Sequence, residues 1–162
     1  MPNMGTRKTK VVSASFSPST VAYDAGDLVG SLLTFEDVIE ADYGGGLIVH
    51  ASIVDLAKQS AALKLLLFNA SISTGTGTTL TDGSAADIGD SDIKDKYIGH
   101  LTFTTGEYVL LNDSSAATNA EQIAFYLPTG RDLYGVLVTQ GTPTYTSGEV
   151  ITVKLGIELD DF

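Results

Sequence analysis

Two histidines carry the readiest acid–base chemistry in this sequence, because an imidazole changes its charge near neutral pH. His50 and His100 each fall within a segment whose residues predict a β-strand. Neither belongs to a His-Glu-x-x-His zinc pattern, and there is no Gly-x-Ser-x-Gly nucleophile elbow. A hydrolase triad would need a hydroxyl and a carboxylate beside one imidazole. We interpret both histidines as ordinary strand residues and assign neither a catalytic residue nor an enzymatic activity.

Adjacent carboxylates occur at Glu36 and Asp37 and again at Asp160 and Asp161, and paired acids can hydrolyse glycosidic bonds. That chemistry requires two acids across a cleft, with the pKa of one raised by burial. Neighbouring acids at strand ends do not meet this requirement. The sequence also lacks Trp, and its 7 Tyr and 6 Phe are scattered, whereas sugar-binding surfaces stack their ligands on exposed rings. Glycan binding is therefore a second hypothesis.

The longest irregular stretch, residues 71–96, is rich in Gly, Ser, Thr and Asp. Its Gly-Thr-Gly-Thr-Thr run lacks the Lys and the following helix of a phosphate-binding loop. The carboxylates that could offer oxygen atoms to calcium are Asp82, Asp87, Asp90, Asp92 and Asp95. Their spacing differs from that of a helix-loop-helix calcium site, and no Glu closes the series. We interpret the stretch as a solvated acidic loop and expect no metal and no cofactor.

The elements that must position these residues are strands. Short runs rich in apolar and β-branched residues are separated by turn-forming Gly, Pro, Asn, Asp and Ser. The predicted strands are residues 8–16, 28–35, 47–56, 63–69, 97–103, 108–112, 122–127, 133–140 and 149–159. The one helical candidate is residues 91–97, where Asp90 or Ser91 would cap one turn, or two at most. The sequence predicts an all-β, jelly-roll-like antiparallel β-sandwich of about eight to nine strands with little helix.

Two of these strands predict how the sheets are covered. From residue 151 to residue 159 every second residue is apolar, so this strand should bury one face. In residues 63–69, Leu66 and Phe68 load the face opposite the other leucines, so both faces should be covered. The second cover is either residues 72–97 of the same chain or a neighbouring subunit, and we favour the former.

Two short segments, residues 22–30 and 144–152, share a Tyr, two variable residues, a Gly, an acid and two apolar positions. We call them the Tyr-turn segments. In each, the Gly can adopt a positive φ at a turn before a strand begins, and the Tyr can fold back over the turn. The residues expected to form these turns are Tyr23, Gly26, Tyr145 and Gly148.

Composition limits the class of protein further. The chain has 162 residues, 43% of them hydrophobic, which suits a single globular domain. Cysteine is absent, so disulfides and thiolate metal sites are excluded and the redox compartment is not indicated. The apolar runs fall far short of the ~20 residues that span a bilayer. The basic start is not followed by an apolar stretch, so we expect no signal peptide and no membrane partner.

Charge constrains the partners. With 20 acidic and 9 basic residues the formal net charge is -11, and such a surface repels phosphate backbones. We therefore expect no nucleic-acid ligand. Arg7, Lys8 and Lys10 precede the first acid, so we expect a basic N-terminal arm at residues 1–10 and a single domain at 11–162. This arm either docks on an acidic neighbour or is a solvated terminus.

A resemblance to a known group emerges when the segments are taken in order. From Val21 onward these are VAYDAGDLVGSLLTFEDV, GGGLIVHASIVDLAKQSAALKLLLFNAS, YIGHLTF and GRDLYGVLVTQGTPTYTSGEVITVKLGIELDD. The series resembles small tailed-bacteriophage virion proteins of the capsid decoration type. In that group a Tyr-x-x-Gly-Asp start, a Gly-rich turn into a long strand, and short "IG" and "LYG" strands precede a terminal acidic strand.

The resemblance implies a jelly-roll-like sandwich that decorates or cements the outside of a capsid shell, and it brings no catalytic residues. The implied partner is the major capsid protein, on virions assembled in the bacterial cytoplasm, with a homo-oligomer, for example a trimer, as the bound form. We infer contacts through Arg7, Lys8 and Lys10, so removing residues 1–10 should weaken attachment and spare the fold. The alternative is a receptor- or glycan-binding module of a phage tail or fibre, and an enzyme is the third hypothesis.

Overall fold

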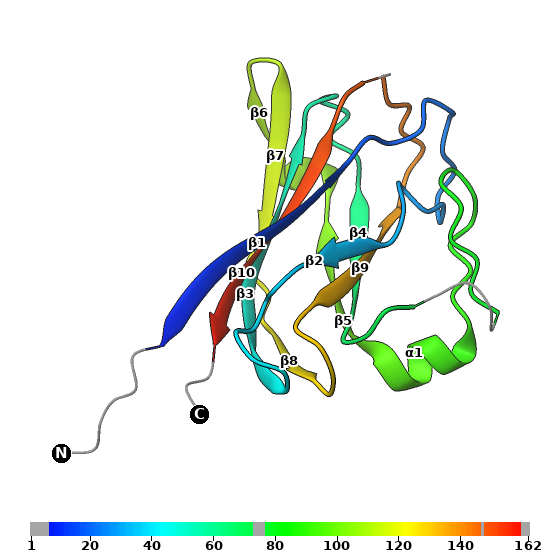
Figure 1. Ribbon diagram of the computed structural model, residues 1–162. Coiled ribbons are helices and arrows are strands. Elements are labelled where there is room, and N and C mark those ends of the chain that lie inside the picture. Colours follow the sequence, from blue (N-terminus) through cyan, green and yellow to red (C-terminus); the bar gives the residue numbers. More distant parts are fainter. Residues whose placement is uncertain (1–6, 73–76, 147, 160–162) are drawn as a thin grey trace.

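The computed structural model describes residues 7–72, 77–146 and 148–159, which form two antiparallel β-sheets packed face to face (Figure 1). The first sheet contains, in order, β1 (Lys8–Phe16), β10 (Ile151–Leu159), β3 (Gly44–Asp55), β7 (Ser114–Asn119) and β6 (Val109–Leu111), with β8 (Ile123–Leu127) also paired to β3. The second contains β2 (Leu33–Phe35), β9 (Leu133–Thr139), β4 (Leu63–Phe68) and β5 (Tyr97–Phe103). A helix, α1 (Asp90–Lys96), and a 3-10 turn (Thr105–Glu107) complete the described elements. The predicted all-β sandwich is confirmed.

The strands pair in a nested order. β1 pairs with β10, β2 with β9, β3 with β8 and β4 with β5, all antiparallel. Nested antiparallel pairs of this kind, distributed over two facing sheets, make a jelly roll. β3 is long enough to pair with β8 along its first half and with β7 along its second half.

The core lies between the two sheets and is built from alternating residues. In β10 the five alternate apolar residues predicted to face inward are buried, and Lys154 between them is exposed. β10 lies between β1 and β3, so the most regular strand of the sequence is a central strand of its sheet. This position explains its pattern, because a central strand packs its whole inner face against the core.

A second apolar cluster lies on the outer face of the second sheet. Phe68 of β4 and two β9 valines, Val136 and Val138, are buried there against Leu28 and Ile72. Partly buried apolar residues from positions 80–97 pack against them. The prediction that residues 72–97 of the same chain cover β4 is thus confirmed within the described residues, and Figure 1 shows residues 77–96, with α1, beside the second sheet.

Three local predictions were wrong. β7 was not predicted, because its residues, Ser-Ser-Ala-Ala-Thr-Asn, have no strong apolar alternation, and pairing with β3 and β6 makes them a strand. The predicted strand at 28–35 is reduced to β2, since Gly30 adopts a φ of 83° and breaks it. α1 begins after Gly89 without a side-chain cap, and Asp90 and Ser91 lie inside the helix.

The Gly-rich run at residues 44–46, which precedes the predicted strand at 47–56 and which the resemblance implies to be a turn, is the beginning of β3. Gly45 and Gly46 sit where neighbouring backbones approach closely, and a Cβ atom on Gly46 would lie 2.5 Å from the carbonyl oxygen of Glu158. At Gly44 the nearest atom would be 3.5 Å away, on Ile39, which is an ordinary contact. Glycine is thus required at Gly46 by close packing of strands and not by a turn.

Candidate attachment surface

The three predicted contact bases form bonds within the chain. Arg7 Nη1 lies 2.9 Å from Glu158 Oε2, Lys8 Nζ lies 2.9 Å from Glu40 Oε2, and Lys10 Nζ donates to the carbonyl oxygen of Asp37. The hydrogen bond and charge of Lys8 lower the pKa of Glu40. Lys8 and Lys10 belong to β1 and pair with β10, whereas residues 1–6 of the predicted arm lie outside the described residues. Removing residues 1–10 would therefore also remove part of a paired strand.

The two Tyr-turn segments lie side by side. Ala22 and Thr144 form an antiparallel bridge, and the rings of Tyr23 and Tyr145 meet edge to face with centroids 5.7 Å apart. Both tyrosines are buried. The positive φ predicted for the two glycines is confirmed, at 97° for Gly26 and 83° for Gly148. The Ala22–Thr144 bridge and the Tyr23–Tyr145 ring contact therefore join two distant parts of the chain at one end of the sandwich.

Asp82, one of the acids considered for calcium, is a structural acceptor. Its carboxylate accepts hydrogen bonds from the Tyr23 hydroxyl at 2.6 Å and from the backbone N–H groups of Ser19 and Gly30, each at 2.8 Å. Burial and the nearby Asp82 charge raise the pKa of Tyr23, so this hydroxyl remains a donor at physiological pH. Asp82 thereby fastens the 71–96 segment to the first Tyr-turn segment.

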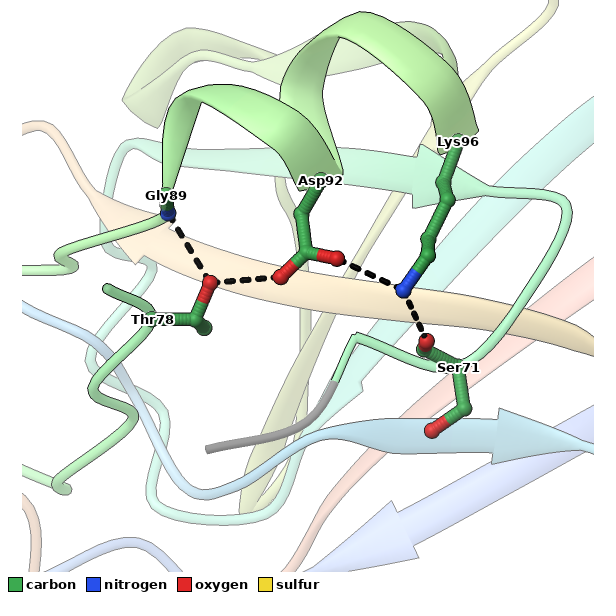
Figure 2. Close-up of polar contacts among 5 residues, drawn as sticks. All are labelled: Ser71, Thr78, Gly89, Asp92 and Lys96. Atoms are coloured by element: carbon green, nitrogen blue, oxygen red, sulfur yellow. Dashed lines mark hydrogen bonds and ion pairs between the residues drawn. The ribbon is translucent and has the colours of Figure 1, made fainter. Parts of the chain in front are cut away.

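Asp92, another acid considered for calcium, forms hydrogen bonds and an ion pair with side chains of the same chain (Figure 2). Its carboxylate accepts from the Thr78 hydroxyl at 2.6 Å and lies 2.6 Å from Lys96 Nζ, which also donates to the carbonyl oxygen of Ser71. Thr78 in turn accepts from the N–H of Gly89. These bonds lower the pKa of Asp92 despite its burial, because they stabilise the charged form. Among the described residues no group of three or more potential ligands could hold a metal ion.

The histidines occupy different sheets. His50 lies on β3 opposite Gly156 of β10, and a side chain at Gly156 would collide with its ring. His100 lies on β5 and shares a 2.6 Å hydrogen bond with the Tyr97 hydroxyl. The His50 ring thus lies beside Gly156 and the His100 ring beside Tyr97. The two imidazoles belong to different sheets and do not form one site.

Among the described residues, the longest run of exposed large apolar side chains is at β6, which the sequence analysis did not single out. Val109, Leu110 and Leu111 are 64%, 66% and 47% exposed. β6 forms a hairpin with β7, and Figure 1 shows this hairpin extending past the end of the second sheet. We call β6, β7 and the turn between them the β6 hairpin. From the sequence, Leu110 and Leu111 are typical of a half-buried strand. They are exposed because the second sheet ends before it reaches them.

A groove of about 680 Å³ lies on another side, between β1 and residues 31–37 that include β2. It is lined by hydroxyl-bearing residues such as Ser13, Ser15 and Thr34 as well as by apolar ones. Lys10 crosses it to reach Asp37. The groove is therefore more polar than the β6 hairpin and is bridged by the chain itself.

Comparison of the sequence with protein-family models and with curated proteins finds no match. No helix among the described residues is long and apolar enough to cross a membrane. The exposed residues of the molecule are therefore the basis of the functional proposal.

Proposed function

We propose that the protein is a structural virion protein that binds the outside of a bacteriophage capsid and decorates or cements its shell. The observation that carries the proposal is the β6 hairpin, whose edge strand has three consecutive exposed apolar residues. Exposed apolar segments of this kind are typical of surfaces that bind other proteins. The resemblance of the chain from Val21 onward to decoration proteins supports the same reading.

Other properties suit this role. A protein stored before assembly at high concentration benefits from net charge, and this chain carries -11. The same charge keeps it from the packaged genome. The lack of cysteine suits assembly in a reducing bacterial cytoplasm. On the shell we expect homo-oligomers around local symmetry axes, for example trimers.

The test is attachment to shells assembled from the major capsid protein encoded in the same genome. Purified protein mixed with these shells should co-sediment saturably, at a fixed ratio to the capsid subunits, and cryo-electron microscopy should show added density on the outer surface. Failure to co-sediment, or density confined to the tail of whole virions, would contradict the proposal.

One observation favours the alternative, a receptor- or glycan-binding module of a tail or fibre. Tyr43 and Tyr126 are 67% and 56% exposed, and Tyr126 pairs with Gly45, two positions after Tyr43. Exposed rings can stack on sugars. Binding to a glycan array that is lost in Tyr126→Ala would support this alternative over shell decoration.

A further inference from the structure

Among the edge strands described, β6 is the one whose residues are all exposed, whereas β2 and β8, which also lack charged residues, bury alternate apolar side chains. β1, at the opposite edge of the first sheet, carries Lys8 and Lys10, and charges of this kind discourage pairing with another strand. At β5, an edge of the second sheet, Asn119 donates to the carbonyl of Thr102 and so links that strand to the first sheet. β6 has three apolar residues and no charge, and β7 is its one strand partner among the described residues. Its free edge can therefore accept an extended segment of another chain.

The register shows which side chains such a segment would meet. Leu110 pairs with Ser115, which pairs with Asp55, and both of these are buried, so Leu110 lies on the core-facing side of the sheet. It is nevertheless 66% exposed, because the second sheet does not extend over it. Val109 faces the other side and is also exposed. A partner strand could cover both faces, and an apolar residue over Leu110 would continue the core.

The charges on either side of β6 indicate which kind of partner segment would pair with it. Exposed acids stand at both ends of β6, Glu107 before it and Asp113 after it. Lys58 reaches the turn, where it donates to the carbonyl of Asn112, so one base lies near the Asp113 end of β6 and none is placed at the Glu107 end among the described contacts. Antiparallel pairing of β6 with a second copy would bring Glu107 of one copy toward Asp113 of the other, which like charges disfavour. A segment with basic residues on both sides of an apolar centre suits the edge better.

We propose that β6 is the docking strand of this protein, and that it pairs with an extended segment of the major capsid protein that is apolar in its centre and basic at its ends. This inference rests on the proposed function. Because β6 has three residues, few backbone hydrogen bonds are available, so burial of Val109 and Leu110 supplies most of the affinity.

The experiment compares Val109→Asp and Leu110→Asp with Val11→Asp in binding to the same assembled shells. Val11 is a matched control, since it is 63% exposed and lies on β1, the opposite edge of the first sheet. We expect each hairpin variant to weaken binding about tenfold or more and the control to stay near the wild type. Glu107→Lys combined with Asp113→Lys should also weaken binding, because it opposes the basic ends of the segment. Thermal unfolding of every variant checks that the sandwich remains folded.

The outcomes separate the two proposals. If the wild type does not attach to shells, shell decoration fails and the docking strand fails with it. If the wild type attaches and the hairpin variants attach equally well, decoration stands and the docking strand is wrong. Self-association of the wild type that Val109→Asp abolishes, with shell binding unchanged, would assign the edge to a second copy and overturn the proposed partner.

Discussion

Tyr23 and Tyr145 hold equivalent places in the two Tyr-turn segments, yet their hydroxyl groups differ. That of Tyr23 donates to Asp82 and accepts from the N–H of Ser19 at 2.9 Å. That of Tyr145 is buried and has no hydrogen-bond partner within the described residues. Burial of a polar group without a partner is costly, whereas a satisfied one is close to neutral or favourable. Tyr23 therefore contributes to stability through both its ring and its hydroxyl group, whereas Tyr145 contributes through its ring alone.

This difference predicts that the same substitution, Tyr to Phe, has different effects on stability at the two positions. Tyr23→Phe should lower the free energy of unfolding by about 1–3 kcal/mol, because it leaves Asp82 and the Ser19 N–H without this partner. Tyr145→Phe keeps the ring contact and removes an unpartnered hydroxyl, so stability should be unchanged or higher. Urea unfolding of both variants measures the effects. A loss in Tyr145→Phe equal to that in Tyr23→Phe would contradict the assignment.

At the scale of elements, β3 organises the first sheet by pairing with β10 on one side and with β7 and β8 on the other. Its first three residues are glycines, and two of them lie against the backbones of these neighbours. The strand can therefore begin between β8 and β10 only where side chains are absent. The β6 hairpin is built on the other half of β3, so this strand also sets how far the hairpin projects.

Alanine substitutions along this run test the role of close packing. Gly46→Ala should destabilise the protein by about 1–3 kcal/mol, because its Cβ would press against the carbonyl of Glu158 and the backbone must move. Gly44→Ala is the matched control in the same strand, and its new methyl group would meet Ile39 at an ordinary distance. Thermal denaturation of the pair measures the difference. Equal melting temperatures would show that the strands do not approach as closely as described.

At the scale of the whole molecule, two buried carboxylates make stability depend on pH in opposite directions. Asp55 caps the turn after β3 by accepting from the N–H groups of Ala57, Gln59 and Ser60, but burial outweighs these bonds and raises its pKa. The bonds from Lys96 and Thr78 lower the pKa of Asp92. The Asp92 contribution is therefore present at neutral pH and lost in acid, whereas Asp55 favours the folded state more strongly as the pH falls.

Asparagine substitutions separate these contributions. At neutral pH, Asp92→Asn should lower the free energy of unfolding by about 1–3 kcal/mol, and this deficit should shrink as the pH falls through and below the ordinary aspartate pKa of about 3.9. For Asp55→Asn the deficit relative to the wild type should instead grow as the pH falls through the raised pKa. Urea unfolding at a series of pH values measures both. Deficits that are constant with pH, or that change in the same direction, would contradict these assignments.

Much of the sandwich follows from local sequence. The bounds predicted for residues 8–16 and 97–103 agree with β1 and β5, and the positive φ at Gly26 and Gly148 was expected from turn chemistry. Alternation of apolar residues and the backbone freedom of glycine act over a few positions, so they can be seen without a fold.

Tertiary structure decided what depends on distant neighbours. β7 has a weak local pattern and is a strand because β3 and β6 pair with it, and Gly46 is needed because another backbone passes close by. Asp82 and Asp92 accept structural hydrogen bonds because the fold places the hydroxyl groups of Tyr23 and Thr78 beside them. Whether Leu110 is covered depends on where the facing sheet ends, which no run of residues around it encodes. The class of fold could thus be predicted from local patterns, whereas the exposure of the β6 hairpin depends on long-range strand pairing.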